Sequence, residues 1–288
     1  MIVMFAVIAA RRKIALPGGK YIAVAHTTTP YFTLLNHTTP GSVSLAATYA
    51  LPGEGWCTSF SPDGKYIAVA HATSPYFTLL NHTTPGSVSL AATYALSGIG
   101  RSTHFSPDGK YIAVAHTTSP FFTLLNHTTP GSVSLAATYA LPSTGYGTHF
   151  SPDGKYIAVA HAGSPYFTLL NHTTPGSVSK AATYTLPSTG WCTSFSPDGK
   201  YIAVAHTTSP YFTLLNHTTP GSVSKAATYT LPSTGRAAHF SPDGKYIAVA
   251  HFTTPYFTLL NHTTPGSVSL AATYTLPGIG YGTAFSPN

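Results

Sequence analysis

One heptapeptide, Lys-Tyr-Ile-Ala-Val-Ala-His, occurs six times in this chain, and the spacing between copies is always 45 residues. The copies begin at Lys20, Lys65, Lys110, Lys155, Lys200 and Lys245. A repeat of this length is typical of β-propellers, in which each repeat folds into one four-stranded blade. Helical solenoids are excluded by the 24 Pro in 288 residues, because Pro at this density breaks helices of ordinary length. No apolar run approaches the ~20 residues of a membrane-spanning helix, so we expect no membrane partner.

The second copy divides into four expected strands, a to d, over residues 57–60, 66–71, 76–81 and 88–96. A Ser-Pro-Asp-Gly turn separates strands a and b, and Asp-Gly supplies the backbone conformations that a tight hairpin needs. Strands b and c are apolar on both faces. Such a sheet must be covered on both faces, which neighbouring blades of a propeller would do.

The longer string Phe-Ser-Pro-Asp-Gly-Lys-Tyr-Ile-Ala-Val-Ala begins at Phe60, Phe105, Phe150, Phe195 and Phe240. It resembles the a–b hairpin of WD-repeat-like bacterial and phage β-propellers, and the resemblance covers residues 16–288. The resemblance implies the fold and says little about function, since propellers host many activities. The Trp-Asp dipeptide and Gly-His pair of eukaryotic WD repeats are absent, so their hydrogen-bond tetrad is not expected here.

The two ends of the chain are out of phase with the blades. Copy one lacks a normal strand a, whereas residues 281–287 supply a surplus one. We therefore predict an all-β propeller of six four-stranded blades, closed by the C-terminal strand joining the first blade, which leaves no open edge. Residues 16–288 would form this single domain, and residues 1–15 a non-repeat segment that is an extra strand or the remnant of a lost blade.

The N-terminal segment gives no convincing signal peptide. Its apolar residues 1–10 precede the cluster Arg11, Arg12 and Lys13, whereas a signal peptide has its cations first. The localisation is left open, with a cytoplasmic or phage-associated location as candidates. The formal charge of +7 comes largely from cations that are spread evenly along the repeats. Nucleic-acid binders gather cations on one face, so no specific nucleic-acid partner is expected.

The copies are nearly identical, so their differences are informative. One variable position lies at the start of strand a and reads Trp, Arg, Tyr, Trp, Arg, Tyr. Another is the b–c loop after the repeated His. Strand direction places both on one face, the top, with the strand-a residues around the mouth of the central channel. These residue types dominate binding hot spots, so we predict a ligand site there, with drift after duplication as the alternative. The predicted ligand-binding residues are Trp56, Arg101, Tyr146, Trp191, Arg236 and Tyr281.

The His that ends each strand b is expected to be structural, bonding a loop backbone group or a Thr of its own b–c turn. A ring of metal-binding imidazoles is the weaker alternative. These residues are His26, His71, His116, His161, His206 and His251. A second repeated His, such as His82 after Asn81, is expected to be a solvated loop residue. Cys57 and Cys192 lie three blades apart, beyond the ~7 Å Cα separation of a disulfide.

The acidic residues argue against catalysis. Five Asp are in identical turns, which leaves Glu54 alone near the predicted site, and one carboxylate makes neither a hard-metal cage nor an acid/base pair. We therefore predict a non-enzymatic scaffold that binds a protein or glycan on its top face, without cofactor or metal. The alternatives are a structural ring without a ligand and, less favoured, a propeller hydrolase of the lactonase kind. A monomer is expected, with domain-swapped oligomers as minor species.

Overall fold

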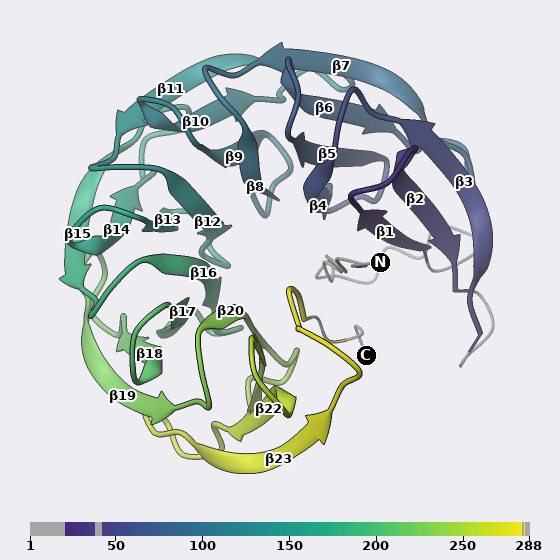
Figure 1. The fold of residues 1–288 in the computed structure, drawn as a ribbon. Coiled ribbons are helices and arrows are strands. Elements are labelled where there is room, and N and C mark those ends of the chain that lie inside the picture. The colour runs from purple at the N-terminus through teal and green to yellow at the C-terminus, as the bar shows by residue number, and fades with distance from the viewer. Residues whose placement is uncertain (1–20, 38–41, 284, 286–288) are drawn as a thin grey trace.

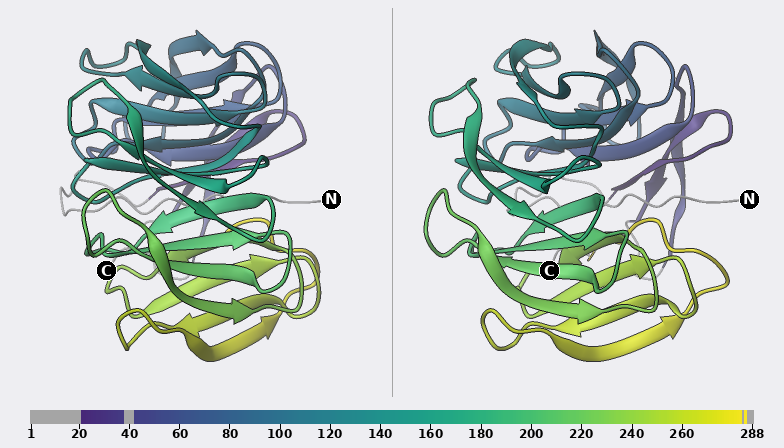
Figure 2. Two further views of the ribbon diagram at one scale, coloured as in Figure 1. Left: turned by 90° about the vertical axis from the view of Figure 1, so that its left-hand side faces the viewer. Right: turned by 60° about the vertical axis from the view of Figure 1, so that its left-hand side comes forward.

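Six antiparallel sheets are arranged around a common axis in the computed structural model, which describes residues 21–37, 42–283 and 285. Figure 1 shows the sheets as blades of a propeller, and the side views of Figure 2 show neighbouring sheets packed against each other along the ring. The described residues contain strands and turns only. They include no helix that could cross a membrane. The all-β propeller predicted from the 45-residue repeat is confirmed.

Each full blade has the strand order a, b, c, d from the axis outward. The inner strands a are β4 (Gly55–Phe60), β8 (Gly100–Phe105), β12 (Gly145–Phe150), β16 (Gly190–Phe195) and β20 (Gly235–Phe240). Strands b are β1 (Tyr21–Ala25), β5 (Tyr66–His71), β9 (Tyr111–His116), β13 (Tyr156–His161), β17 (Tyr201–His206) and β21 (Tyr246–His251). Strands c are β2 (Tyr31–Asn36), β6 (Tyr76–Asn81), β10 (Phe121–Asn126), β14 (Tyr166–Asn171), β18 (Tyr211–Asn216) and β22 (Tyr256–Asn261). The outer strands d are β3 (Ser44–Ala50), β7 (Ser89–Ala95), β11 (Ser134–Ala140), β15 (Ser179–Thr185), β19 (Ser224–Thr230) and β23 (Ser269–Thr275).

The a–b turn is held by the repeated Asp. In the second blade, Ser61 Oγ donates to Asp63 Oδ1 at 2.6 Å, and the backbone N–H of Lys65 donates to the same oxygen at 3.1 Å. Gly64 has φ 72°, a conformation in which a side chain is strained. The carboxylate is therefore engaged in closing the turn on the bottom face, as the sequence predicts for a turn former.

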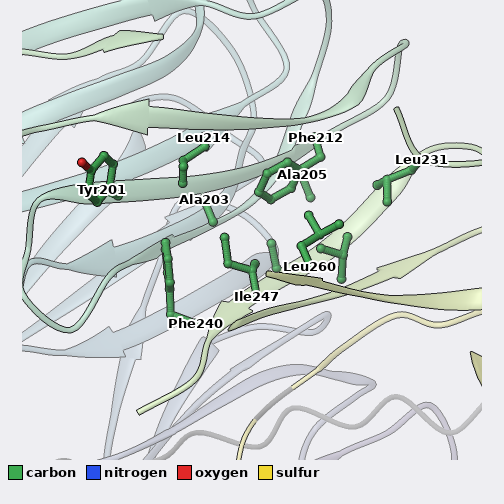
Figure 3. Packing of buried hydrophobic residues seen from close by; sticks show 11 residues of the cluster. Tyr201, Ala203, Ala205, Phe212, Leu214, Leu231, Phe240, Ile247 and Leu260 are labelled. Atoms are coloured by element: carbon green, nitrogen blue, oxygen red, sulfur yellow. The ribbon is translucent and has the colours of Figure 1, made fainter. Parts of the chain in front are cut away.

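The blades pack face to face through apolar side chains. Figure 3 shows the seam between the fifth and sixth blades, where Phe212 and Leu214 pack against Ile247 and Leu260. All four side chains have 0% exposure, and burying a side chain of this size stabilises the fold by about 1.5–3 kcal/mol. The same positions form four further seams between blades one and five. This packing explains why strands b and c are apolar on both faces.

The second repeated His, expected to be solvated, is buried. His82 is 3% exposed, its Nδ1–H donates to the Gly64 carbonyl at 2.8 Å, and its ring meets the ring of Tyr21 edge-on at 4.8 Å. Equivalent contacts hold the later copies of this His. The expectation is wrong because this imidazole joins its own a–b turn to the preceding blade, a role that a loop sequence does not reveal.

The His that ends strand b is also buried, with His71 at 0% exposure. Its Nε2 lies 3.0 Å from the hydroxyl of Thr78, and the other five copies have the same bond. The side-chain partner is a Thr of strand c, seven residues further on, and not a Thr of the b–c turn. The other expected partner, a backbone group of that turn, is present at Thr73. The arrangement is that of a structural residue, because the bond ties two neighbouring strands inside the blade.

The first sheet has three strands, β1 to β3, because the described residues include no strand paired with the inner edge of β1. Thr283 Oγ donates to the Ala248 carbonyl at 3.3 Å, which repeats the bond of Thr58 to the Ala23 carbonyl at 3.2 Å. The C-terminal segment thus lies against the sixth blade as a strand a would. Its pairing with β1 stays a prediction, and the predicted segment 1–15 lies outside the described residues.

Candidate functional site

A β-bulge positions the variable residues at the start of the inner strands. In β4, Gly55 lies opposite His71 and Cys57 opposite Ala70, so Trp56 is the extra residue of a β-bulge. The same register shift occurs in β8, β12, β16 and β20. A bulge re-aims the side chain that it carries. The bulged residues are Trp56, Arg101, Tyr146, Trp191 and Arg236, and with Tyr281 we call them the inner top residues.

The inner top residues stack on one another around the axis. The Arg101 guanidinium lies 4.3 Å from the ring centre of Trp56 and 5.9 Å from that of Tyr146. The rings of Tyr146 and Trp191 are 4.2 Å apart. All six side chains are half-buried. The series continues from Trp191 to Arg236 at 3.7 Å, from Arg236 to Phe252 at 4.1 Å and to Tyr281 at 5.9 Å, and from Phe252 to Tyr281 at 5.7 Å.

The b–c loops lie at the same end of the ring as the inner top residues. Trp191 donates its indole N–H to Thr207 Oγ at 2.8 Å, and Phe252 of another b–c loop stacks on Arg236. The two variable regions of the repeat are therefore adjacent in space, as strand direction predicts. Together they surround the ring axis at this end, the top of the propeller.

A second set of variable residues lies three positions further along each inner strand. The rings of His104 in β8 and His149 in β12 are 3.9 Å apart, with an interplanar angle of 33°. Both side chains are partly exposed. The sequence analysis missed this pair, although the signal was present, because the corresponding position of β4 and β16 is a Ser.

Both imidazoles of this pair are hydrogen-bonded to the backbone of Phe150. The backbone N–H of Phe150 donates to His104 Nδ1 at 3.3 Å, which favours the neutral tautomer with its proton on Nε2, and a second backbone interaction of this ring is with Phe105. His149 Nδ1 donates to the Phe150 carbonyl at 2.8 Å, so the lone pair of the neutral ring is on Nε2. Two imidazoles whose Nδ1 atoms contact the same residue thus lie side by side on adjacent blades.

Burial keeps two imidazoles of the inner strands neutral, that of His104 and that of His239 in β20. Burial, together with the charge of His239, lowers the pKa of His104 to about 4. Burial also lowers the pKa of His239 to about 4, and its Nδ1 lies 3.3 Å from Thr283 Oγ. At neutral pH, His104 and His239 are therefore uncharged, which is the form that donates or accepts single protons.

The described residues give little support to catalysis by a Cys nucleophile or to a metal site. Cys57 and Cys192 are free thiols, and burial raises the pKa of both, that of Cys192 to about 11. A thiol is nucleophilic as the thiolate, so neither residue is suited to attack a substrate. Within the part of the chain that the structure describes, no three His, Cys, Asp or Glu side chains are grouped to hold a metal ion.

No protein-family model matches the sequence, and neither does any curated protein. Solved structures do match in fold. A protein of Bacteroides uniformis ATCC 8492, provisionally assigned as a 6-phosphogluconolactonase, has a TM-score of 0.81 at 14% identity, over 92% of this chain and 85% of its own. The periplasmic gluconolactonase PpgL of Pseudomonas aeruginosa has a TM-score of 0.66 at 15% identity, over 90% and 97%. The β-propeller domain of Cps50 (Swd1) from Myceliophteria thermophila has a TM-score of 0.70 at 11% identity, over 96% and 87%.

These comparisons correct the functional prediction. The non-enzymatic scaffold with a protein or glycan on the top face is contradicted, because structures described as lactonases are among those most similar to this chain. A physical reason accompanies the correction. The aromatic and Arg side chains expected to contact a macromolecule are stacked against each other, so part of their contact surface is used within the ring. The lactonase alternative is the one carried forward.

Proposed function

We propose that this chain hydrolyses lactones, with His149 as general base and His104 as hydrogen-bond donor. The observation that carries the proposal is the stacked imidazole pair, whose Nδ1 atoms are both engaged by the backbone of Phe150. The likeness to two proteins described as lactonases supports it through the shared fold. A lactone suits this site because a cyclic ester needs only water activation and charge stabilisation, and a single general base supplies about 10²–10⁴-fold acceleration.

The proposed reaction uses water as the nucleophile. His149 Nε2 takes a proton from a water molecule as the water oxygen bonds to the lactone carbonyl carbon. His104 Nε2–H donates a hydrogen bond to the carbonyl oxygen, which becomes negative in the tetrahedral intermediate. The ring C–O bond then breaks, and the proton held by His149 passes to the released alkoxide. The product is the open hydroxy acid, and both imidazoles return to their starting tautomers.

The low pKa of His104 suits its role. A ring that stayed protonated would have a second N–H on Nδ1, facing the backbone N–H of Phe150. The neutral form avoids this clash of two donors and leaves Nε2–H available to the substrate. Burial, the main cause of the low pKa, also strengthens the hydrogen bond to a developing oxyanion.

The test is the hydrolysis of glucono-δ-lactone, followed in a pH-stat against the uncatalysed rate. Wild-type protein should exceed the background, and His149→Gln should lose about 10²-fold or more of that acceleration. His37→Gln, which changes a partly exposed His on the bottom face, should retain full activity. A wild-type rate equal to background would refute the proposal and favour the structural ring without a ligand.

A further inference from the structure

The first and sixth blades are the two ends of an arc of six blades. Figure 1 shows the sheet of β1–β3 at one end and the sheet of β20–β23 at the other. Five apolar seams join neighbouring blades from the first to the sixth. Among residues 21–37, 42–283 and 285, no such cluster of buried side chains joins the sixth blade to the first. Each end of the arc therefore presents a blade face that no other described blade covers.

The sixth-blade face is exposed at positions that are covered in the other seams. All seven residues of β23 are exposed. Tyr274 is 67% exposed, whereas its equivalent Tyr49 packs into the seam between the first and second blades. Phe257 is half-buried, whereas its equivalent Phe32 has 0% exposure. The sixth blade thus has the apolar side chains of a seam without a partner blade packed against them.

The first blade presents the other side of a seam. Val43 is 58% exposed, whereas its equivalent Val88 packs into the seam between the first and second blades. Ile22 is half-buried, whereas its equivalent Ile67 has 0% exposure. The two end faces of the arc therefore have the same side chains, at the same positions of the repeat, as the two sides of a closed seam.

The C-terminal segment marks where the next blade would lie. Thr283 donates to the Ala248 carbonyl, as Thr58 of β4 donates to the Ala23 carbonyl of the preceding blade. The sixth blade is thus followed by a segment placed as a strand a. The first blade has strands b, c and d, and the described residues give it no strand a. A first blade seated on the sixth would therefore complete one four-stranded blade.

The five closed seams resist bending. They use the same side chains at the same positions, so they set similar angles between blades, and close-packed interiors are hardly compressible. To bring its own first blade onto its sixth, a chain would have to deform these seams together. A second copy can supply the first-blade face while every seam keeps its geometry.

We propose that the sixth blade of one chain binds the first blade of a second copy, head to tail. Tyr274 and Phe257 lie on one side of this contact, and Ile22 and Val43 lie on the other. The contact is heterologous, so each added copy leaves one free face at each end of the assembly. The closure predicted from the sequence is the same contact within one chain, and it is the competing outcome.

The contact is apolar, which sets its dependence on salt. Each chain has a formal net charge of +7, so two copies repel each other at long range. Salt screens this repulsion and leaves the burial of apolar surface in place. Association should therefore become tighter as sodium chloride is added, whereas an interface held by ion pairs would become weaker.

The test is sedimentation velocity of the full-length protein over a range of concentrations. The average mass of the wild type should rise above that of one chain as the concentration rises. Tyr274→Glu and Val43→Glu each place a carboxylate in one end face, at a position exposed in the single chain. Each should weaken association about 10-fold or more, because the seam would bury an unpaired charge. Leu135→Glu is the control, since Leu135 is 52% exposed on the third blade, and it should associate as the wild type does.

A mixture of the two end-face variants tests the head-to-tail arrangement itself. The Val43→Glu chain keeps an intact sixth-blade face, and the Tyr274→Glu chain keeps an intact first-blade face. At concentrations where each variant alone is a monomer, their equimolar mixture should form dimers and nothing larger. A contact between two identical faces would not produce this result.

Three outcomes would overturn the inference. The first is a wild type with the mass of one chain at every concentration, which would favour closure within the chain. The second is association of either end-face variant as tight as that of the wild type, and the third is a mixture that stays monomeric. Circular dichroism and the melting temperature of each variant exclude unfolding as the cause. None of these measurements depends on lactone hydrolysis, so the contact and the proposed function are tested separately.

Discussion

Trp191 donates its indole N–H to the hydroxyl of Thr207 at 2.8 Å, and this bond distinguishes the two halves of the ring. Half a ring away, Trp56 has Ala72 at the position of Thr207, and its Nε1 is buried without a hydrogen-bond partner. The series Trp, Arg, Tyr at the start of the inner strands is thus repeated in residue type but not in hydrogen bonding. A buried indole N–H without a partner costs about 1–3 kcal/mol.

Restoring the missing hydroxyl should stabilise the fold. We expect Ala72→Thr to raise the free energy of unfolding by about 1 kcal/mol, because the new Oγ can accept from Trp56. Thr207→Ala is the matched control and should lower it by about the same amount. Guanidinium chloride unfolding of the three proteins measures both changes. If the Ala72→Thr protein were no more stable than the wild type, the indole N–H of Trp56 would already have another hydrogen-bond partner.

The inner strands approach the preceding blade so closely that Gly is required where they begin. A Cβ on Gly100 would lie 2.5 Å from the Tyr76 carbonyl oxygen, which is backbone that cannot move aside easily. Gly100→Ala should therefore destabilise the fold by about 1–3 kcal/mol. Gly278→Ala is the control, since nothing lies within 4 Å of its added Cβ. Equal melting temperatures for the two variants would contradict the tight approach.

Stability should fall as the pH falls below about 6.5. Burial lowers the pKa of several imidazoles to about 4 in the folded chain, whereas their ordinary value is 6.5. Between these values the unfolded chain binds more protons, so each residue removes on the order of 1 kcal/mol as the solution is acidified through this window. The residues are His71, His104, His116, His161, His206 and His239. Urea unfolding from pH 8 to pH 4.5 tests this, and a constant midpoint from pH 7 to pH 5 would contradict it.

The C-terminal segment should be needed for a stable ring. Thr283 and Tyr281 contact the sixth blade, so deletion of residues 281–288 should expose that blade and lower the melting temperature or cause aggregation. Deletion of residues 286–288 alone is the control. Light scattering and thermal unfolding decide between the outcomes, and an unchanged monomer after the longer deletion would show that the predicted closure is wrong.

The sequence predicted the fold well because the 45-residue period leaves few architectures open, and because Asp63 and Gly64 mark a turn that needs no tertiary context. It predicted the site less well. Trp56 and its counterparts were recognised as variable, but the β-bulge that orients them depends on pairing with His71 and Ala70. The His104–His149 pair was missed because its members lie 45 residues apart on different blades. Contacts across blades, such as that of His82 with Tyr21, cannot be predicted from the sequence of one repeat, because the two residues belong to different repeats.

The five seams described between neighbouring blades use the same side chains at the same positions. Recombination within the gene that removed or added one 45-residue unit would therefore create a junction already present in the protein. Both blades at that junction would pack against the same apolar side chains as before. Selection on chain length would then act on the curvature of the whole circle and on the spacing of the Arg and His residues around it. Such a gene can change its number of units without first acquiring compensating substitutions.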